Sequence, residues 1–315
     1  MGSRAWSMDG EVRVVHPIER LRWVARSPEG DMSLVAAEAA DALASFADDP
    51  AGLVIASRRL IERRPAAGPL WWLASRVLCA LDPVFEAMDA AADLERDRTA
   101  VALAGDLPGG TVAIVAWPDQ ASAALRMRGR MGGGEPGADR VVVVPAGPAG
   151  GRAASAGDEP WELTSAGPRV SRRQGRWEPP DNGGWGCVDW LQSHGVDARL
   201  LPAGEVTAAG RRSVLALLEA TAVGPDSFLA PAGSAALAEA AREANRPVWL
   251  VAGVGRVLPG PLYDALIRRV GDDPAFEVVP LAAVDDVAGP AGPVPRARMP
   301  RPACPVAAEL LRFSG

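Results

Sequence analysis

The chain has 315 residues with a formal net charge of −6, and 48% of its residues are hydrophobic. All 33 basic residues are arginine, which excludes a Schiff-base lysine, a P-loop lysine and a lysine general base. The length predicts about two domains with packed cores, and the acidic balance argues against a nucleic-acid-binding protein that relies on bulk attraction to phosphates.

Histidine and cysteine are both scarce. The two histidines, His16 and His194, cannot build a multi-histidine metal centre, and the cysteines at 79, 187 and 304 lie far apart without a CxxC pair. We therefore predict no metal or other cofactor and a reducing, cytoplasmic compartment. No stretch approaches the roughly 18 uninterrupted apolar residues of a membrane-spanning helix, so no membrane partner is expected.

The first third of the chain has two parts. Residues 1–30 form an N-terminal arm, and residues 31–106 have the pattern of a helical domain, with apolar side chains at helical spacing over 32–47. Asp49 and Asp82 each stand directly before a proline, which is the order of a helix N-cap and its first helical residue. We expect a helical bundle here, with a long helix after Asp82.

The region from 107 to 290 alternates between short apolar runs and helical segments, the order of a parallel sheet with helical crossovers. The predicted strands are 111–117, 140–144, 197–201, 227–230 and 247–252. The predicted helices are 121–127, 187–193, a segment near 211–222, and 233–244. The sequence predicts an α/β protein: an N-terminal helical bundle followed by a Rossmann-like open parallel sheet with helices on both faces.

Two segments have no regular period. Residues 145–186 are rich in Gly, Pro, Arg and Trp and are predicted to be a long loop or insertion. The glycine-rich start of this segment, 145–152, lacks the GxGxxG order and the following acid of a dinucleotide site, which favours a plain flexible loop. Residues 291–315 form a Pro- and Arg-rich tail that ends in a short helix near 307–313.

Ligands of open parallel sheets bind at the carboxyl ends of the strands, so the residues that follow each strand are candidate site residues. After the first strand, Asp119, Gln120 and Ser122 can present polar groups to a phosphate or sugar, with the amides of the next helix assisting an anion. The alternative is that Asp119 or Ser122 only caps that helix.

Two later strand ends offer further candidates. Gly233 and Ser234 open a helix directly after a strand, and their amides can meet an anion, although a short strand-to-helix turn explains the same residues. Arg256 follows the strand at 247–252 and is either a phosphate clamp or a solvated surface arginine.

Several segments, taken together, resemble a known family. They are Arg64-Pro65 ahead of an apolar helix, Gly-Ser-Ala-Ala-Leu-Ala at 233–238, Pro-Val-Trp-Leu-Val-Ala at 247–252 and Phe-Glu-Val-Val-Pro-Leu at 276–281. In this order, from about residue 32 to 290, the chain resembles the translation initiation factor 2B alpha/beta/delta-like family. That family also contains methylthioribose-1-phosphate isomerase and ribose-1,5-bisphosphate isomerase.

The resemblance implies a phosphorylated sugar or nucleotide bound between the helical domain and the strand ends, and a homodimer formed through the Rossmann-like half. It implies that Arg64 is a retained phosphate-binding position and that Arg256 lies near another. The isomerases of the family use a cysteine after the first strand and an aspartate in a later Gly-Ala-Asp turn. Here Asp119 stands at the place of the cysteine, and residues 231–233 read Pro-Ala-Gly without a carboxylate.

Three functions stay open at this point. The first is a catalytically degenerate, isomerase-like protein that binds a ligand or acts as a regulatory or interaction protein, because moving hydrogen between sugar carbons needs an acid and a base. The second is an aldose–ketose isomerase for a phosphorylated pentose, with Asp119 as base and Arg64 and Arg256 holding phosphate. The third is a dimeric scaffold protein without a small-molecule ligand.

Overall fold

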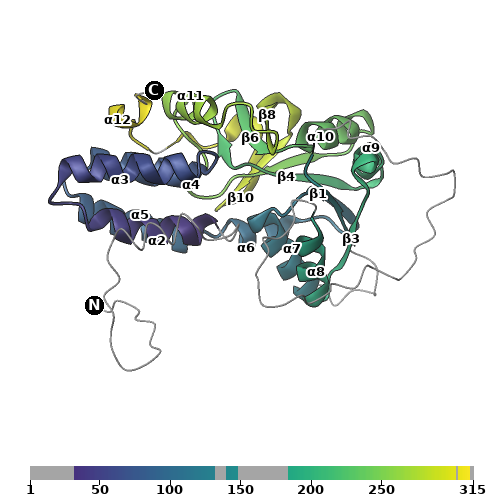
Figure 1. Cartoon of the computed structure of the whole chain (residues 1–315). Helices are drawn as coiled ribbons and strands as arrows, with labels where there is room; N and C mark the ends of the chain where they lie inside the picture. Colours follow the sequence, from purple (N-terminus) through teal and green to yellow (C-terminus); the bar gives the residue numbers. More distant parts are fainter. Residues whose placement is uncertain (1–31, 132–139, 148–183, 303, 313–315) are drawn as a thin grey trace, which may run out of the picture.

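The computed structural model of the chain describes residues 32–131, 140–147, 184–302 and 304–312 (Figure 1). The predicted N-terminal arm and most of the predicted loop at 145–186 lie outside these residues. Helices form the N-terminal part of what is described, and a mostly parallel sheet with its helices follows. None of the described helices combines the length and the apolar character that crossing a membrane requires.

The helical half contains α2 (Met32–Ala44), α3 (Pro50–Arg63), α4 (Gly68–Cys79), α5 (Pro83–Glu95) and α6 (Thr99–Asp106). In Figure 1, α2 and α5 lie side by side below α3 and α4. Asp49 and Asp82 form the predicted caps, since their carboxylates accept the amides of Gly52 at 2.9 Å and Phe85 at 3.0 Å. Local sequence signals therefore set where α3 and α5 begin.

The single long helix predicted after Asp82 is wrong, because the chain divides it into α5 and α6 at residues 96–98. Asp97 is the cause. Its Oδ1 accepts hydrogen bonds from the Thr99 amide at 2.9 Å and from the Thr99 hydroxyl at 2.6 Å. A carboxylate that takes amide donors from the residues after it starts a new helix instead of continuing the old one.

Seven strands form the central sheet, in the order β10-β9-β7-β4-β1-β2-β3. They are β1 (Thr111–Val115), β2 (Arg140–Val144), β3 (Asp197–Leu200), β4 (Leu215–Glu219), β7 (Val248–Val251), β9 (Asp286–Gly289) and β10 (Gly292–Pro295). All their pairings are parallel except that of β10 with β9. The strand order runs in opposite directions from β1 and β4, so the switch point, where such sheets bind ligands, lies between these two strands.

Helices cover both faces of this sheet, as predicted. On one face lie α6, α7 (Asp119–Met131) and α8 (Trp185–Ser193), and on the other lie α9 (Val206–Arg212) and α10 (Ser234–Glu243) (Figure 1). The buried side chains of each face form a separate apolar cluster. The predicted fold class, a helical bundle followed by a Rossmann-like sheet, is therefore confirmed.

The prediction of a helix near 211–222 is wrong, because this segment holds the central strand β4. The sequence Leu-Ala-Leu-Leu-Glu consists of residues with high helix propensity, which is why the pattern favoured a helix. In the structure β4 lies between β1 and β7 and all five residues are buried. A strand that is covered on both faces needs apolar side chains throughout, and this tertiary requirement overrides local propensity.

The segment predicted as a strand at 227–230 is a strand, but it does not join the parallel sheet. It belongs to a second, antiparallel sheet of β5 (Ala222–Val223), β6 (Ser227–Pro231) and β8 (Phe276–Pro280). Only a short turn joins β5 to β6, and the amide of Gly224 donates to the Ser227 carbonyl across it at 2.8 Å. A connection this short can link only antiparallel strands, because a parallel pair needs a long crossover.

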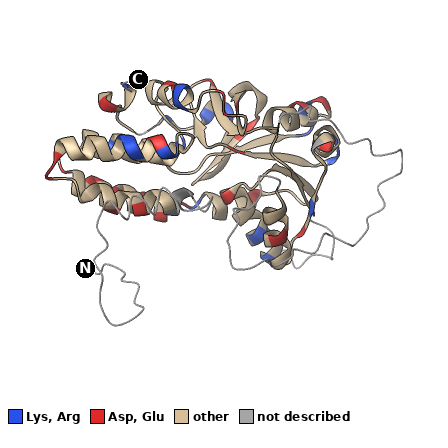
Figure 2. Cartoon of the chain, in the orientation of Figure 1, with Lys and Arg blue, Asp and Glu red and all other residues tan. Residues whose placement is uncertain are grey.

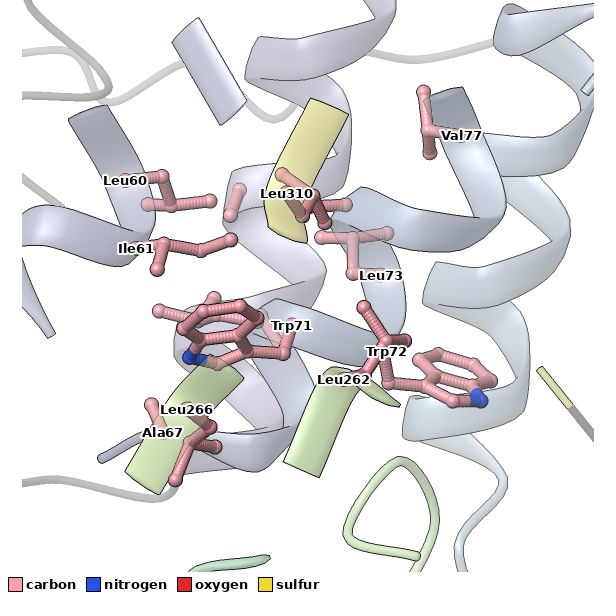
Figure 3. Close-up of a cluster of buried hydrophobic side chains, with 14 of the residues drawn as sticks. Leu60, Ile61, Ala67, Trp71, Trp72, Leu73, Val77, Leu262, Leu266 and Leu310 are labelled. Atoms are coloured by element: carbon pink, nitrogen blue, oxygen red, sulfur yellow. The ribbon is translucent and has the colours of Figure 1, made fainter. Parts of the chain in front are cut away.

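The two halves of the molecule share an apolar core. Trp71 is fully buried beside α3 and α11 (Gly260–Val270), and its indole nitrogen donates to the Pro65 carbonyl at 2.9 Å (Figure 3). The amide of Gly68 donates to the carbonyl of Thr221 at 3.0 Å. The start of α4 thus contacts the chain directly after β4, at the boundary between the halves.

The C-terminal segment returns to the helical half. The sequence placed its tail after residue 290, but β10 still belongs to the sheet. Beyond the sheet, Arg58 donates to the Glu309 carbonyl at 2.8 Å. The predicted terminal helix is the short α12 (Ala308–Leu311), whose Leu310 lies among leucines of α3 and α4 (Figure 3).

Candidate functional site

Three neighbouring strands end at the switch point of the sheet. We define their ends as the carboxyl edge: residues 116–122 after β1, 219–221 at the end of β4, and 252–256 after β7. The predicted site residues on this edge are Asp119, Gln120, Ser122 and Arg256.

A buried ion pair joins two of these strand ends. The carboxylate of Glu219 lies 2.9 Å from the guanidinium of Arg256, and each side chain is 5% exposed. Arg256 also donates to the carbonyl of Ala220. Two charges this well shielded from water depend on each other, because either one left alone in a dry environment is strongly destabilising. Arg256 is therefore not a solvated surface residue, and its charge is engaged by Glu219.

The second carboxylate oxygen of Glu219 occupies the N-terminus of α7. Oε2 accepts the amide of Ala121 at 2.9 Å. Open amides at a helix N-terminus attract anions, and here an internal carboxylate holds that place. Sequence reasoning missed Glu219 because it sits in the segment predicted as a helix. A carboxylate at the end of the apolar run Leu-Ala-Leu-Leu was the signal available.

Asp97 connects the helical half to the same edge. Its Oδ2 accepts the carboxamide of Gln120 at 2.6 Å and the amide of Val254 at 2.9 Å. A Cβ at Gly253 would lie 2.3 to 2.4 Å from the side-chain ends of Gln120 and Asp97, so any larger residue would have to displace this hydrogen-bonded pair. We refer to Asp97, Gln120, Glu219 and Arg256 as the polar network.

Two buried atoms of the polar network have no hydrogen-bond partner among the described residues: Oε1 of Gln120 and Nε of Arg256. One is an acceptor and the other a donor. Buried polar atoms are normally satisfied, often by an internal water molecule, so these two atoms are exceptions within the described residues.

Cys187 of α8 has a buried thiol that contacts α7. Its sulfur is 3.5 Å from the hydroxyl of Ser122. Burial raises the pKa of Cys187 to about 11; the contact with Ser122 lowers it in part, and the nearby charges of Asp119 and Glu219 raise it further. A thiol with this pKa stays protonated at neutral pH and is a weak nucleophile and base. Asp119 itself is half-buried in the first turn of α7.

The second predicted anion position is also occupied. Gly233 precedes α10 with a φ of +103°, a backbone conformation that glycine adopts at little cost. The hydroxyl of Ser234 donates to the Pro231 carbonyl at 2.7 Å. The amide of Ala235 donates to the carboxylate of Glu277, from β8, at 2.7 Å. The N-terminus of α10 thus carries an internal negative charge, as that of α7 does.

The structure brings only some of the predicted site residues close together. A Cβ built on Gly233 would lie 3.7 Å from the side chain of Val115, so this turn reaches the end of β1. Gln120 bonds to Asp97, and Arg256 pairs with Glu219, which also accepts the amide of Ala121 next to Gln120. Arg64 ends α3, where its amide donates to the Ile61 carbonyl at 3.1 Å. It sits in the turn that leads into α4, near the boundary between the halves.

The structure also contains a pocket of about 320 Å³ beside the edge strand β8 and the end of α11. It is lined by Leu229, Ile267, Val270, Gly271, Asp272, Asp273, Pro274, Phe276, Glu277 and Val278. None of the seven site residues that the sequence predicted belongs to this lining. The pocket is therefore separate from the site residues that the sequence predicted.

No protein-family model matches the sequence, and no curated protein matches it. Solved structures do match. The translation initiation factor eIF-2B from Pyrococcus horikoshii OT3 gives a TM-score of 0.65 at 14% identity, with 88% of this chain and 96% of that chain covered. This chain has the fold of that initiation factor. The resemblance inferred from the sequence is confirmed at the level of the fold.

Two further structures share the initiation factor 2B fold. The 5-methylthioribose 1-phosphate isomerase from the same organism gives a TM-score of 0.57 at 17% identity, covering 89% of this chain and 84% of that one. A tetrameric eIF2B-beta2-delta2 complex from C. thermophilum gives 0.62 at 17% identity, with coverages of 90% and 91%. The fold is thus found in both a sugar-phosphate isomerase and subunits of a larger assembly.

Proposed function

We propose that this chain is a divergent member of the initiation factor 2B-like family that has lost isomerase catalysis and acts in the cytoplasm as a ligand-binding or regulatory protein. One observation carries the proposal: internal carboxylates occupy both helix N-termini at the strand ends, Glu219 at α7 and Glu277 at α10. An isomerase acting on a phosphorylated sugar at these places needs amides that are open to its anionic substrate.

Charge opposes a phosphorylated substrate at both places. A phosphate monoester carries a charge of about −1.5 to −2 at neutral pH, and each carboxylate repels it. Arg256 is the predicted phosphate-binding cation of the carboxyl edge, but its guanidinium pairs with Glu219. Moving Arg256 to a phosphate would leave that carboxylate buried and uncompensated.

Acid–base chemistry supports the same proposal. An aldose–ketose isomerisation needs groups that give and take a proton within hydrogen-bond reach of two adjacent carbons. The thiol of Cys187 is fully buried and its raised pKa keeps it protonated. A protonated, buried thiol supports the proposal because it is a poor acid–base partner for Asp119.

The test is a turnover assay on the purified protein with 5-methylthioribose 1-phosphate and, separately, ribose 1,5-bisphosphate. NMR of the sugar carbons measures the conversion, and we expect none above the rate in buffer. Rapid turnover of either substrate would overturn the proposal.

A thermal-shift panel of phosphorylated sugars and nucleotides then separates a ligand-binding protein from a scaffold without a ligand. The panel also tests the ligand-binding residues predicted from the sequence, which are Arg64, Gln120, Ser122, Gly233, Ser234 and Arg256. A stabilising ligand whose effect is lost in Gln120→Ala supports the binding role. An unchanged melting temperature across the panel favours the scaffold.

An active isomerase is the second candidate, and one observation favours it. Asp119, at the end of β1, is near enough to Cys187 for its charge to raise the pKa of the thiol, so a carboxylate and a thiol do share this region. If the turnover assay finds activity, Asp119→Asn should reduce it by a factor of about 10² to 10⁴. Unchanged activity in that variant would exclude Asp119 as the base.

We also propose a homodimer formed through the Rossmann-like half. Support comes from the fold, since a solved structure that shares it is a tetrameric complex of two kinds of subunit. Light scattering at micromolar concentration measures the mass directly. A monomer would count against this part of the proposal and leave the loss of catalysis untouched.

A further inference from the structure

Helix α5 presents an apolar face to solvent. Val84, Phe85 and Met88 are 41%, 66% and 64% exposed, and Leu81, just before the helix, is fully exposed. We define these four residues as the α5 patch. Single exposed apolar side chains are ordinary, but Val84 and Met88 lie one turn apart on α5, Phe85 lies beside them and Leu81 precedes the helix. Exposed apolar side chains that gather in this way mark interaction sites.

The patch points away from the core of the helical half. Ala87, Ala90 and Leu94 are the buried residues of α5, which packs against α2 and α4. With 3.6 residues per turn, Phe85 and Met88 lie on the opposite side of the helix from these three. The core face of α5 is already covered, so the α5 patch is a second, outward face.

Carboxylates flank the patch on the side of α4. Glu86, Asp89 and Asp93 all contact the guanidinium of Arg76, the latter two at 2.7 and 2.8 Å. Arg96 also lies 3.4 Å from Asp93. Two positive charges therefore meet three negative charges, and this flank keeps a net negative charge. Figure 2 shows red segments along α2 and α5, in line with a negative surface on this pair of helices.

Charge decides which occupant fits. A second copy of this chain fits poorly, because pairing two α5 helices would bring the carboxylates of one copy against those of the other. We propose that the α5 patch docks an amphipathic helix of a partner protein, with apolar side chains on one face and arginine or lysine beside them. Its apolar face covers Phe85 and Met88 while its cations meet Asp89 and Asp93.

This docking surface deepens the proposed regulatory role, but it lies on a different element from the strand ends. A failure of the docking proposal therefore leaves the proposed loss of catalysis standing, and turnover of a sugar phosphate would leave the docking proposal standing.

The test measures binding of a designed peptide to the full chain by fluorescence anisotropy. The probe is a helical peptide of about 18 residues with leucine on one face and arginine on the other, and its control has the same composition in scrambled order. We expect saturable binding of the amphipathic peptide only. Raising the salt from about 0.05 to about 0.5 M should weaken it several-fold, because the flanking charges are exposed.

The variants Phe85→Asp and Met88→Asp should each weaken binding by a factor of at least about 10, since both side chains lie at the centre of the contact. Val101→Asp, at an exposed apolar residue of α6, is the matched control and should bind like the unmodified chain. Both substituted side chains are exposed, so circular dichroism should report an unchanged fold.

Three outcomes would overturn the proposal. The first is equal binding of the peptide to the unmodified chain and to Phe85→Asp. The second is no binding at all, which is also the result expected if a segment of the chain itself covers the patch. The third is a dimer that Phe85→Asp converts to a monomer, which would assign the patch to a second copy.

Discussion

Two arginines show how differently the two halves of the molecule treat charge. Arg256, at the carboxyl edge, pairs with one carboxylate, and both side chains are 5% exposed. Arg76, in the helical half, contacts Glu86, Asp89 and Asp93, whose side chains are 25 to 44% exposed, and it stacks on Trp72 with its guanidinium carbon 4.6 Å from the ring centre.

The comparison teaches that burial, and not the number of contacts, sets the role of each cluster. The Arg256 pair has one ionic partner but almost no water, so each charge depends on the other. The Arg76 cluster has three partners, but water can hydrate each carboxylate if the arginine is lost. The first cluster fills the edge where a ligand would bind, whereas the second belongs to an accessible surface.

Removing the buried arginine should have the largest effect. Arg256→Met leaves the Glu219 carboxylate buried without a cation, and we expect the free energy of unfolding to fall by about 3–5 kcal/mol. Urea unfolding followed by circular dichroism measures this loss. The double variant Glu219→Gln/Arg256→Met removes both charges and should recover part of it. A loss below about 1 kcal/mol in the single variant would contradict the description of a dry pair.

The pH dependence of stability tests the dryness of the same region. Burial raises the pKa of Cys187 from 9.0 to about 11 in the folded chain. Between these values the unfolded thiol loses its proton while the folded one keeps it, so stability falls as pH rises from about 9 to 11. Two pKa units correspond to a loss of about 2–3 kcal/mol.

The variant Cys187→Ser, whose serine does not titrate in this range, should make that slope shallower in urea unfolding experiments. Part of the slope should remain, because burial also raises the pKa of Cys304 to about 12. Cys79→Ser is the control, since this thiol is exposed and should leave most of the slope in place. An identical slope in Cys187→Ser and the unmodified chain would show that the thiol is not held in a dry site.

Close packing at the carboxyl edge gives a third prediction. The added methyl group of Gly253→Ala would collide with Gln120 and Asp97, and we expect a destabilisation of about 1–3 kcal/mol. Gly105→Ala, inside α6, meets nothing within 4 Å and should stabilise the protein by about 0.5–1 kcal/mol. Thermal unfolding of the two variants should therefore shift in opposite directions.

The smallest effect is expected in the helical half. Arg76→Met leaves three carboxylates that water can reach, so the loss should be about 1 kcal/mol, and salt should reduce it further. Urea unfolding at low and high salt measures both. A loss equal to that of Arg256→Met would contradict the contrast drawn between the two clusters.

Much of the fold could be predicted because its signals are local. Asp49 and Asp82 predict the starts of two helices, because a proline follows each of them. Each carboxylate then caps the amide three residues later. Apolar runs at 111–117 and 140–144 become β1 and β2 because a buried parallel strand needs such a run. The strand ends could then be chosen as candidate sites from the topology alone, and Gln120 and Arg256 each have a buried polar partner there.

The error at β4 and the failure to predict Glu219 arose where a distant part of the chain decides the outcome. The segment that became β4 reads as a helix, and only its place between β1 and β7 makes it a strand. Glu219 reaches the amide of Ala121 from 98 residues away, and no spacing rule predicts such a contact. For Arg256 the sequence left a phosphate clamp and a solvated surface arginine open, because burial is not visible there.

The sequence by itself determined the class of fold and the starts of the capped helices, because each depends on residues close together in the chain. Only the tertiary structure decided that this edge is filled by Glu219, Glu277 and Arg256. Electrostatic interactions act through space and grow stronger as water is excluded, so their partners and their strength are set by the folded chain.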